Sequence, residues 1–163
     1  MKIFITGVAG FLGSHLADLM ISQGHTVAGN DNMIGGYADN VPQGVEFHQV
    51  DCCDLENLTK AMEGCDIVYH TAATAYEGLS VFSPVLVTRN IFEASVTTIT
   101  AAIRNNVKRI VYCSSMARYG HHDKMPYRET YECRPQDPYG IAKKAGEDVL
   151  KNLCETHGVE YVI

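Results

Sequence analysis

The chain has 163 residues, of which 46% are hydrophobic and 20% are charged, and its formal net charge is −6 at pH 7. This length and composition predict one globular domain with a sizeable core. The acidic balance without a basic run argues against nucleic acid as a partner, and no stretch is apolar for long enough to predict a membrane span. The six cysteines form no C-x-x-C pair, so we expect reduced thiols in a cytoplasmic protein.

The first predicted element is a strand over residues 2–6, an apolar and β-branched run that leads directly into a glycine-rich turn. A helix is predicted over residues 14–23, where apolar side chains share one face and a glycine follows. Strand, turn and helix together are the context of a dinucleotide-binding fingerprint, with an ordinary βα turn as the alternative. In that fingerprint Gly7 permits the tight turn, Gly10 lets the backbone approach a pyrophosphate, and Gly13 lets the helix pack closely on the strand.

A second strand is predicted over residues 26–30 and leads into Asp31. A carboxylate at that point can accept hydrogen bonds from both hydroxyls of an adenosine ribose and would repel a 2′-phosphate, so the sequence favours NAD over NADP. The alternative is an aspartate that only starts a turn. Residues 32–44 are rich in Gly, Asn, Asp and Pro and are predicted to form a loop.

A third strand is predicted over residues 45–50, and Asp54 is placed to cap a helix that Gly64 ends. A fourth strand follows over residues 67–70. Three small residues come directly after it and leave room for a flat ligand across the sheet edge. They are Thr71, Ala72 and Ala73.

The second half of the chain continues the alternation of strands and helices. We predict a loop over 76–83, a helix over 84–105, a strand over 109–113, a loop over 116–137, a helix over 138–157 and a strand over 159–163. Residues 96–100 have a strand-like composition inside a predicted helix. The alternation predicts an α/β fold, a doubly wound parallel sheet of about six strands with helices on both faces. The loops after the first five strands then converge on the carboxyl edge of the sheet.

Two residues of the last predicted helix suggest acid–base chemistry. Tyr139 and Lys143 are four residues apart and therefore share one helix face. A nearby ammonium stabilises a phenolate, and an oxidised nicotinamide would add a second positive charge, so the tyrosine could serve as a general base. Ser115, at the end of the fifth strand, can donate a hydrogen bond to the reacting oxygen. The alternative for Tyr-x-x-x-Lys alone is an exposed helix that contains the pair by chance.

No metal site is predicted, because the sequence has no His-Glu-x-x-His motif and no cluster of Cys and His. His121 and His122 are read as a solvated loop pair, with a substrate contact as the alternative.

These motifs resemble those of the extended short-chain dehydrogenase/reductases, in the nucleotide-sugar epimerase/dehydratase group. The resemblance rests on Thr6-Gly7-x-x-Gly10-x-x-Gly13, His70-x-Ala72-Ala73, Ser114-Ser115-x-x-x-Tyr119-Gly120 and Pro138-Tyr139-x-x-x-Lys143. It implies a Rossmann-like fold that binds NAD. It also implies Ser115, Tyr139 and Lys143 as the catalytic set, and a second set that binds the cofactor. That second set is Gly7, Gly10, Phe11, Leu12, Gly13, Asp31, Asn32, Asp51, Cys52, Thr71, Ala72, Ala73, Asn90, Tyr139 and Lys143.

The resemblance also guides the choice of reaction. Dehydratases of this group usually carry an acidic pair just after the serine, whereas Met116-Ala117 supply no acid or base. We therefore expect a nucleotide-sugar 4-epimerase that transfers a hydride transiently to bound NAD through a 4-keto intermediate. The alternatives are a reductase or 4,6-dehydratase of the same family, and a non-catalytic NAD-binding module.

Two expectations about assembly follow from the same resemblance. Members have a second, smaller substrate domain, so residues 1–163 are expected to be an NAD-binding domain that stops after the sixth strand. The helices at 84–105 and 138–157 resemble a pair that forms an intersubunit four-helix bundle, so we expect a homodimer. Candidates for its apolar seam are Ile91, Val96, Val149 and Leu153.

Overall fold

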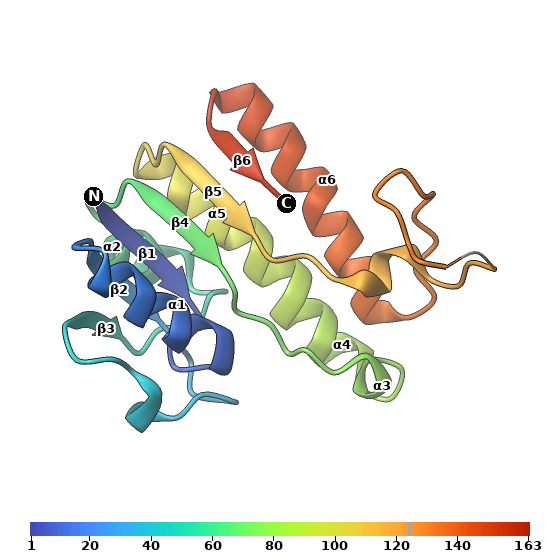
Figure 1. Ribbon diagram of the computed structural model, residues 1–163, viewed down its shortest axis with the longest axis horizontal. Coiled ribbons are helices and arrows are strands. Elements are labelled where there is room, and N and C mark those ends of the chain that lie inside the picture. The colour runs from blue at the N-terminus through green and yellow to red at the C-terminus, as the bar shows by residue number, and fades with distance from the viewer. Residues whose placement is uncertain (124) are drawn as a thin grey trace.

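Strands in the order β3-β2-β1-β4-β5-β6 form a parallel sheet through the middle of the molecule (Figure 1). The computed structural model describes residues 1–123 and 125–163. The described strands are β1 (Lys2–Thr6), β2 (Thr26–Asn30), β3 (Val45–His48), β4 (Ile67–His70), β5 (Arg109–Tyr112) and β6 (Glu160–Val162). This order confirms the predicted doubly wound sheet and places its reversal point between β1 and β4.

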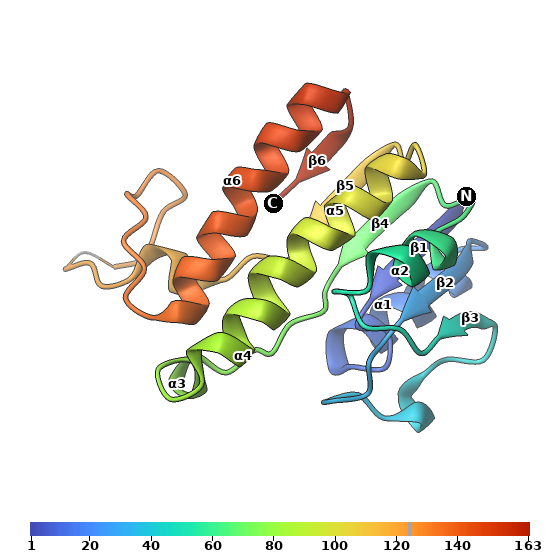
Figure 2. The same cartoon turned by 180° about the vertical axis from the view of Figure 1, so that it is seen from behind.

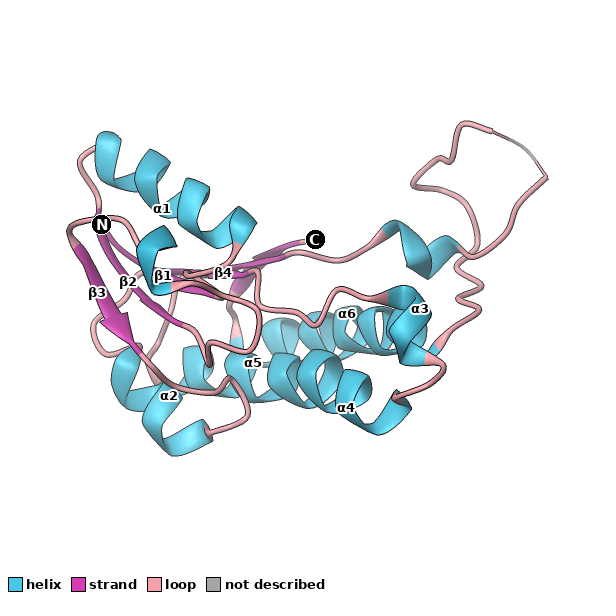
Figure 3. Ribbon diagram, turned by 90° about the horizontal axis from the view of Figure 1, so that it is seen from below, coloured by secondary structure: helices cyan, strands magenta, loops and turns pink. Residues whose placement is uncertain are grey.

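Helices cover both faces of the sheet. Helix α1 (Phe11–Ser22) lies on one face, and the opposite face carries α2 (Leu55–Ala61), α4 (Pro84–Thr88), α5 (Ala94–Arg104) and α6 (Pro138–His157) (Figures 2 and 3). Among the described residues, no helix combines the length and the apolar character needed to cross a bilayer.

The strands supply side chains alternately to two apolar layers, as the period of two requires. Ile3 and Ile5 of β1 pack against Ala17 of α1. The intervening Phe4 joins the larger layer, where Ile99 and Leu150 come from α5 and α6. The core therefore fixes both helix layers to the same central strand.

The predicted helix boundaries hold where caps define them. The Asp54 carboxylate accepts a hydrogen bond from the Asn57 N–H at 3.1 Å, and Gly158 ends α6 with a left-handed φ of 69°. Helix α1 begins at Phe11, three residues before the predicted start at residue 14, because Gly10 takes the N-cap position. Strands β3, β5 and β6 are each shorter than predicted.

The predicted helix over 84–105 is confirmed in extent but is irregular. It consists of α4, a π-helical turn η2 (Arg89–Glu93) and α5, and it ends at Arg104. The strand-like run 96–100 is helical, because Thr98 and Ile99 are buried against the sheet and packing outweighs local preference.

Three predicted loops contain short helical turns. These are the 3-10 turn η1 (Ala38–Asn40), helix α3 (Glu77–Ser80) and the 3-10 turn η3 (Met116–Tyr119). Each is a single turn closed by local bonds, such as that from the Ser80 N–H to the Tyr76 carbonyl at 3.2 Å. A turn this short leaves no apolar period in the sequence, so these three predictions of loop were wrong at those residues.

Candidate active site

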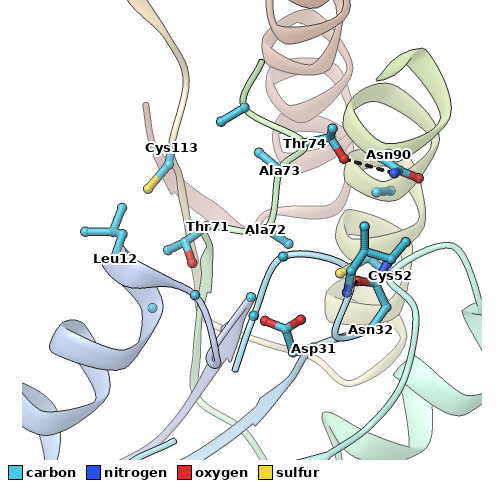
Figure 4. A pocket seen from close by; sticks show the side chains of 18 of the residues that line it. Leu12, Asp31, Asn32, Cys52, Thr71, Ala72, Ala73, Thr74, Asn90 and Cys113 are labelled. Carbon is cyan, nitrogen blue, oxygen red and sulfur yellow. Dashed lines mark hydrogen bonds between the residues drawn. The ribbon is translucent and has the colours of Figure 1, made fainter. Parts of the chain in front are cut away.

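A cavity of about 540 Å³ opens at the carboxyl edge of the sheet (Figure 4). Every predicted cofactor-binding residue lines it, including Tyr139 and Lys143 of α6. The cavity thus brings together loops that follow β1, β2, β3, β4 and β5. Asp31, Asn32 and Cys52 lie toward one end, whereas Leu12, Thr71 and Cys113 lie toward the other (Figure 4).

The glycine turn brings the start of α1 against β1. Gly7 has a φ of 71°, which side chains other than glycine rarely adopt, and a Cβ on Gly13 would lie 2.2 Å from the Gly7 carbonyl oxygen. Gly10 caps α1 without a side-chain hydrogen bond, and the first turn carries no acidic residue. The first residues of α1 line the cavity, and N–H groups at a helix start, which lack partners within the helix, suit a pyrophosphate. The exposed side chain of Phe11 flanks them.

Asp31 is held in one orientation at the end of β2. Its Oδ1 accepts the Met33 N–H at 2.8 Å and its Oδ2 accepts the Ala9 N–H at 3.2 Å. The residue is only 8% exposed. Each carboxylate oxygen still has a lone pair for a ligand hydroxyl, as recognition of a ribose requires.

Asp51 forms the neighbouring wall and has a partner that the sequence did not reveal. Its Oδ2 lies 3.3 Å from Asn32 Nδ2 and 3.3 Å from Arg89 Nη1. Burial raises the pKa of Asp51, but hydrogen bonds from the Cys53 N–H, Asn32 and Arg89 outweigh it and hold that pKa below its usual value. An ionised acceptor therefore stands at this end of the cavity.

A hydrogen-bonded network beneath the cavity fixes residues 71 and 72. The Thr6 hydroxyl oxygen accepts the N–H groups of Thr71 and Ala72, each at 3.1 Å, so its own proton points to His70 Nδ1 at 2.8 Å. His70 is consequently the Nε2–H tautomer and donates to Ser95 Oγ at 3.1 Å. Burial lowers the pKa of His70 to about 3, which keeps the ring neutral.

The π-helical turn brings Asn90 to the cavity wall. Its side chain is buried and donates from Nδ2 to Thr74 Oγ1 at 2.9 Å (Figure 4). Wider turns of this kind occur often at functional sites, because they change the direction of one side chain without ending the helix.

Tyr139 and Lys143 are fixed by the first turns of α6. Asp137 caps the helix by accepting the Gly140 N–H at 2.8 Å. The Lys143 ammonium donates to the Cys113 carbonyl at 2.8 Å and lies 5.3 Å from the centroid of the Tyr112 ring. Burial lowers the pKa of Lys143 to about 8. The predicted pair on one helix face is thus directed at the end of β5.

The pKa of the Tyr139 phenol does not follow the expectation that a nearby ammonium would bring it toward neutrality. Burial raises that pKa, the hydrogen bond with Ser115 lowers it, and the charges of Glu77 and Asp137 raise it. The net direction is upward, because desolvation of the phenolate is the largest effect.

Ser115 does not itself line the cavity but adjoins residues that do. Its hydroxyl accepts the Ala117 N–H at 3.1 Å at the start of η3, and its interaction with the Tyr139 phenol lowers the pKa of that phenol. Sequence reasoning missed further lining residues, most of which directly follow the predicted ones in the strand-end loops. They are Asn30, Ile34, Gly35, Gly36, Thr74, Ala75, Tyr76, Ala94, Cys113 and Ser114.

The loop histidines make contacts within their own segment. His122 Nε2 lies 2.9 Å from the Glu132 carbonyl oxygen, and His121 Nε2 lies 3.6 Å from an oxygen of Asp123. In the described ranges, 1–123 and 125–163, no three His, Cys, Asp or Glu side chains are grouped to hold a metal ion.

Comparison with known proteins gives a consistent set of matches. Residues 3–163 match the model of the NAD dependent epimerase/dehydratase family. A probable UDP-arabinose 4-epimerase of Arabidopsis thaliana is 31% identical over 172 residues, which cover 99% of this chain and 42% of that protein. The chain spans about half the length, or somewhat less, of the relatives that it matches.

Two solved structures show the same architecture. The UDP-glucose 4-epimerase of Thermotoga maritima, solved with UDP-glucose, has a TM-score of 0.95 and 31% identity, covering 99% of this chain and 53% of that one. The Thermus thermophilus UDP-glucose 4-epimerase, solved with NAD, has a TM-score of 0.93 and 32% identity, with coverage of 99% and 53%.

Proposed function

The chain belongs to the NAD dependent epimerase/dehydratase family, and from this premise we propose that it acts as a nucleotide-sugar 4-epimerase whose residues 1–163 form the NAD-binding domain. NAD is the cofactor, and the glycine cradle with Asp31 beyond it fits that molecule. One observation carries the proposal: a single cavity joins the cradle after β1 to Tyr139 and Lys143 on α6. The 4-epimerases among the similar proteins support the epimerase reaction over the alternatives.

Three residues have proposed roles in the reaction. Tyr139 accepts the proton of the sugar 4-hydroxyl, and the Ser115 hydroxyl steadies the phenol and the reacting oxygen. Lys143 supplies positive charge beside the site and fixes the end of β5 through the Cys113 carbonyl. NAD, when bound, supplies the acceptor for the hydride on the sugar carbon. Met116-Ala117 bring no acid or base, which supports epimerisation rather than loss of water.

Substitution of the proposed base tests this function in the whole protein. Tyr139→Phe should reduce epimerisation by about 10²–10⁴ while NAD remains bound, because only one acid–base group is removed. Tyr161→Phe, on β6, is the matched control and should retain the parent rate. Product analysis with UDP-, dTDP- and GDP-sugars identifies the substrate, and an unchanged rate in Tyr139→Phe refutes the assignment. Formation of a reduced or dehydrated product would instead favour one of the alternative reactions.

We also propose a homodimer, but with a changed seam. Ile91 is buried in its own chain beside Val87 and Tyr139, so the expectation that it lies in an intersubunit seam was wrong. Helices α4 and α5 follow one another end to end, and α6 lies beside them on the outer face (Figure 2). Their exposed apolar side chains are better candidates, with Val85 at 83% and Ile141 at 53% exposure.

Sedimentation of the parent and two variants tests the proposed dimer. Val85→Glu should raise the dimer dissociation constant by about tenfold or more, since an unpaired carboxylate would be buried at the seam. Leu19→Glu introduces the same charge at an exposed leucine of α1, away from the proposed seam, and should leave the dimer dissociation constant unchanged. A parent that is monomeric at micromolar concentrations excludes this seam.

The cysteines support the cytoplasm as the proposed location. All six are free thiols, and Cys52 lines the cavity beside Asp51. Burial raises the pKa of Cys52 to about 11, so this thiol is protonated and unreactive at neutral pH.

A further inference from the structure

The proposed chemistry leaves one buried acid unused. Glu147 of α6 is fully buried, although glutamate is almost never buried without a partner. It follows Lys143 by four residues, as Lys143 follows Tyr139, so the three side chains share one helix face. Glu147 therefore faces the same side of α6 as the proposed base.

The Glu147 carboxylate has two partners on the segment after β5, a hydrogen bond at Oε1 and an ion pair at Oε2, although Oε2 accepts no hydrogen bond from the described residues. Ser114 donates its hydroxyl to Oε1, and Arg118 Nη2 lies 3.0 Å from Oε2. The Arg118 side chain is itself only 21% exposed, and its Nε donates to Cys133 Sγ at 3.2 Å. One carboxylate thus ties α6 to the end of β5, to the turn η3 and, through Arg118, to the loop at residue 133.

Ser115 stands between these two contacts in the chain. It is fixed on one side by Ser114 and on the other by Arg118 of η3, and Ala117 of the same turn packs in one apolar cluster with Tyr139. The two segments also touch directly, because a Cβ on Gly140 would lie 2.7 Å from the Ala117 carbonyl oxygen. The separation of Ser115 and Tyr139 therefore depends on how η3 is held against α6.

A buried ion pair is suited to fixing such a separation. A carboxylate out of water is costly unless it is paired and hydrogen-bonded. Movement of η3 away from α6 would take Arg118 with it and leave the buried Glu147 carboxylate unpaired, and this cost opposes the movement. Such pairs often add little net stability, and in some proteins they select one arrangement among several. The exposed pair of Lys144 and Asp148 on the same helix makes a helical i,i+4 contact and joins no second segment.

We propose that Glu147 and Arg118 are positioning residues that hold Ser115 against the phenol of Tyr139. The inference rests on the proposed function, in which Tyr139 is the base and Ser115 its partner. Neither positioning residue needs to touch substrate or cofactor. Apart from burial, the groups that shift the pKa of the phenol are Ser115, Glu77 and Asp137, and of these only Ser115 lies on the segment that Glu147 holds.

The test is a double-mutant cycle in which the measured quantity is the pKa of the Tyr139 phenol. The pKa of Tyr139 is measured by ultraviolet titration, with Tyr139→Phe subtracted, in the parent and in the double variant Arg118→Gln/Glu147→Gln. The double change removes one positive and one negative charge, so the net charge is constant. Ser115→Ala is then added to each background. We expect Ser115→Ala to raise the Tyr139 pKa in the parent and to raise it by less than half as much in the double variant, because Ser115 is then no longer held close to the phenol.

Two further variants keep the result decisive. Lys144→Gln/Asp148→Asn removes the exposed pair of the same helix and should leave the effect of Ser115→Ala at its parent size. Ser114→Ala removes one hydrogen bond of Glu147 and keeps the ion pair; it should also reduce that effect and is the variant to use if the double variant does not fold.

The proposal is overturned if Ser115→Ala shifts the Tyr139 pKa equally in the parent, the folded double variant and Ser114→Ala. It is also overturned if removal of the Lys144–Asp148 pair reduces the effect of Ser115→Ala on the Tyr139 pKa as much as removal of the Arg118–Glu147 pair does. The measurement needs no turnover, so a failure of the proposed function, seen as full activity in Tyr139→Phe, is recognised separately.

Discussion

Asp31 illustrates how one residue can choose between two cofactors. Its carboxylate is oriented by two backbone N–H groups before any ligand arrives, so little freedom remains to be lost on binding. Ribose hydroxyls can donate to it, whereas a 2′-phosphate would meet a buried negative charge. Residues 32–44 contain no Arg or Lys that could offset that repulsion.

We therefore expect Asp31→Ala to narrow the preference for NAD over NADP. Loss of hydrogen bonds to a charged acceptor should weaken NAD binding by about tenfold to hundredfold, and NADP should lose less or gain. Direct titration of both cofactors measures the change. Asp39→Ala, an exposed aspartate of η1, is the control, and equal affinities for the two cofactors in the parent would contradict the assignment.

Helix α6 carries the proposed base in its first turn, so its cap bears on both stability and chemistry. Asp137 satisfies the Gly140 N–H with its side chain and also raises the pKa of the Tyr139 phenol by its charge. These two influences can be separated, since asparagine caps a helix about as well as aspartate but carries no charge.

Asp137→Ala should lower the free energy of unfolding by about 1 kcal/mol, whereas Asp137→Asn should change it much less. Both variants should lower the pKa of Tyr139, because each removes a negative charge near the phenolate. Chemical denaturation and ultraviolet titration give the two readings. Equal stability of the two variants would show that the cap contributes nothing.

Elements with a strong local signal were predictable, and those that depend on the fold were not. The glycine turn, the Asp54 cap and the start of α6 at Pro138 all agree with their residue patterns. The π-helical turn at Arg89–Glu93 leaves no such pattern, and its Ile91 packs with Val87 and Tyr139, a contact that exists only in the folded chain.

The same division holds for the cavity. Residues at strand ends were placed correctly, since topology alone brings them to one edge. Arg89 and Arg118 were missed because their partners, Asp51 and Glu147, lie 38 and 29 residues away, and neither pairing has a sequence spacing that reveals it. Glu147 could have been found, because it continues the four-residue spacing of Tyr139 and Lys143.

At the scale of the whole molecule, His70 joins elements that are distant in the chain. It bonds Thr6 of β1 and Ser95 of α5, and Ser95 also contacts the Tyr112 hydroxyl of β5 at 3.2 Å. The ring must stay neutral, because its Nδ1 accepts a hydrogen bond from the Thr6 hydroxyl. Protonation would break this contact.

Acid should therefore destabilise the fold through His70. In the unfolded chain His70 is protonated near its ordinary pKa of 6.5, whereas in the folded chain its pKa is about 3. The unfolded state therefore binds more protons between these two values, and the free energy of unfolding falls as pH is lowered through that window. The slope from this group is at most about 1.4 kcal/mol per pH unit. Denaturant unfolding in the upper part of the window, where few carboxylates titrate, measures it.

His70→Gln should lose this component of the slope, although it also weakens the network. His157→Gln, an exposed change at the end of α6, should keep the parent slope. The interpretation fails if parent and His70→Gln show the same dependence on pH.

The lining of one cavity by loops from both halves of the sheet also has a consequence for the lifetime of the protein. A molecule bound there contacts the loops after β1, β2, β3, β4 and β5, together with α6, and it meets that surface only when all of them are in place. By mass action, a cofactor at about 100 times its dissociation constant adds about 2.7 kcal/mol to the stability of the folded state. Proteases act on the unfolded fraction, so the abundance of this protein should rise and fall with the dinucleotide supply of the cell.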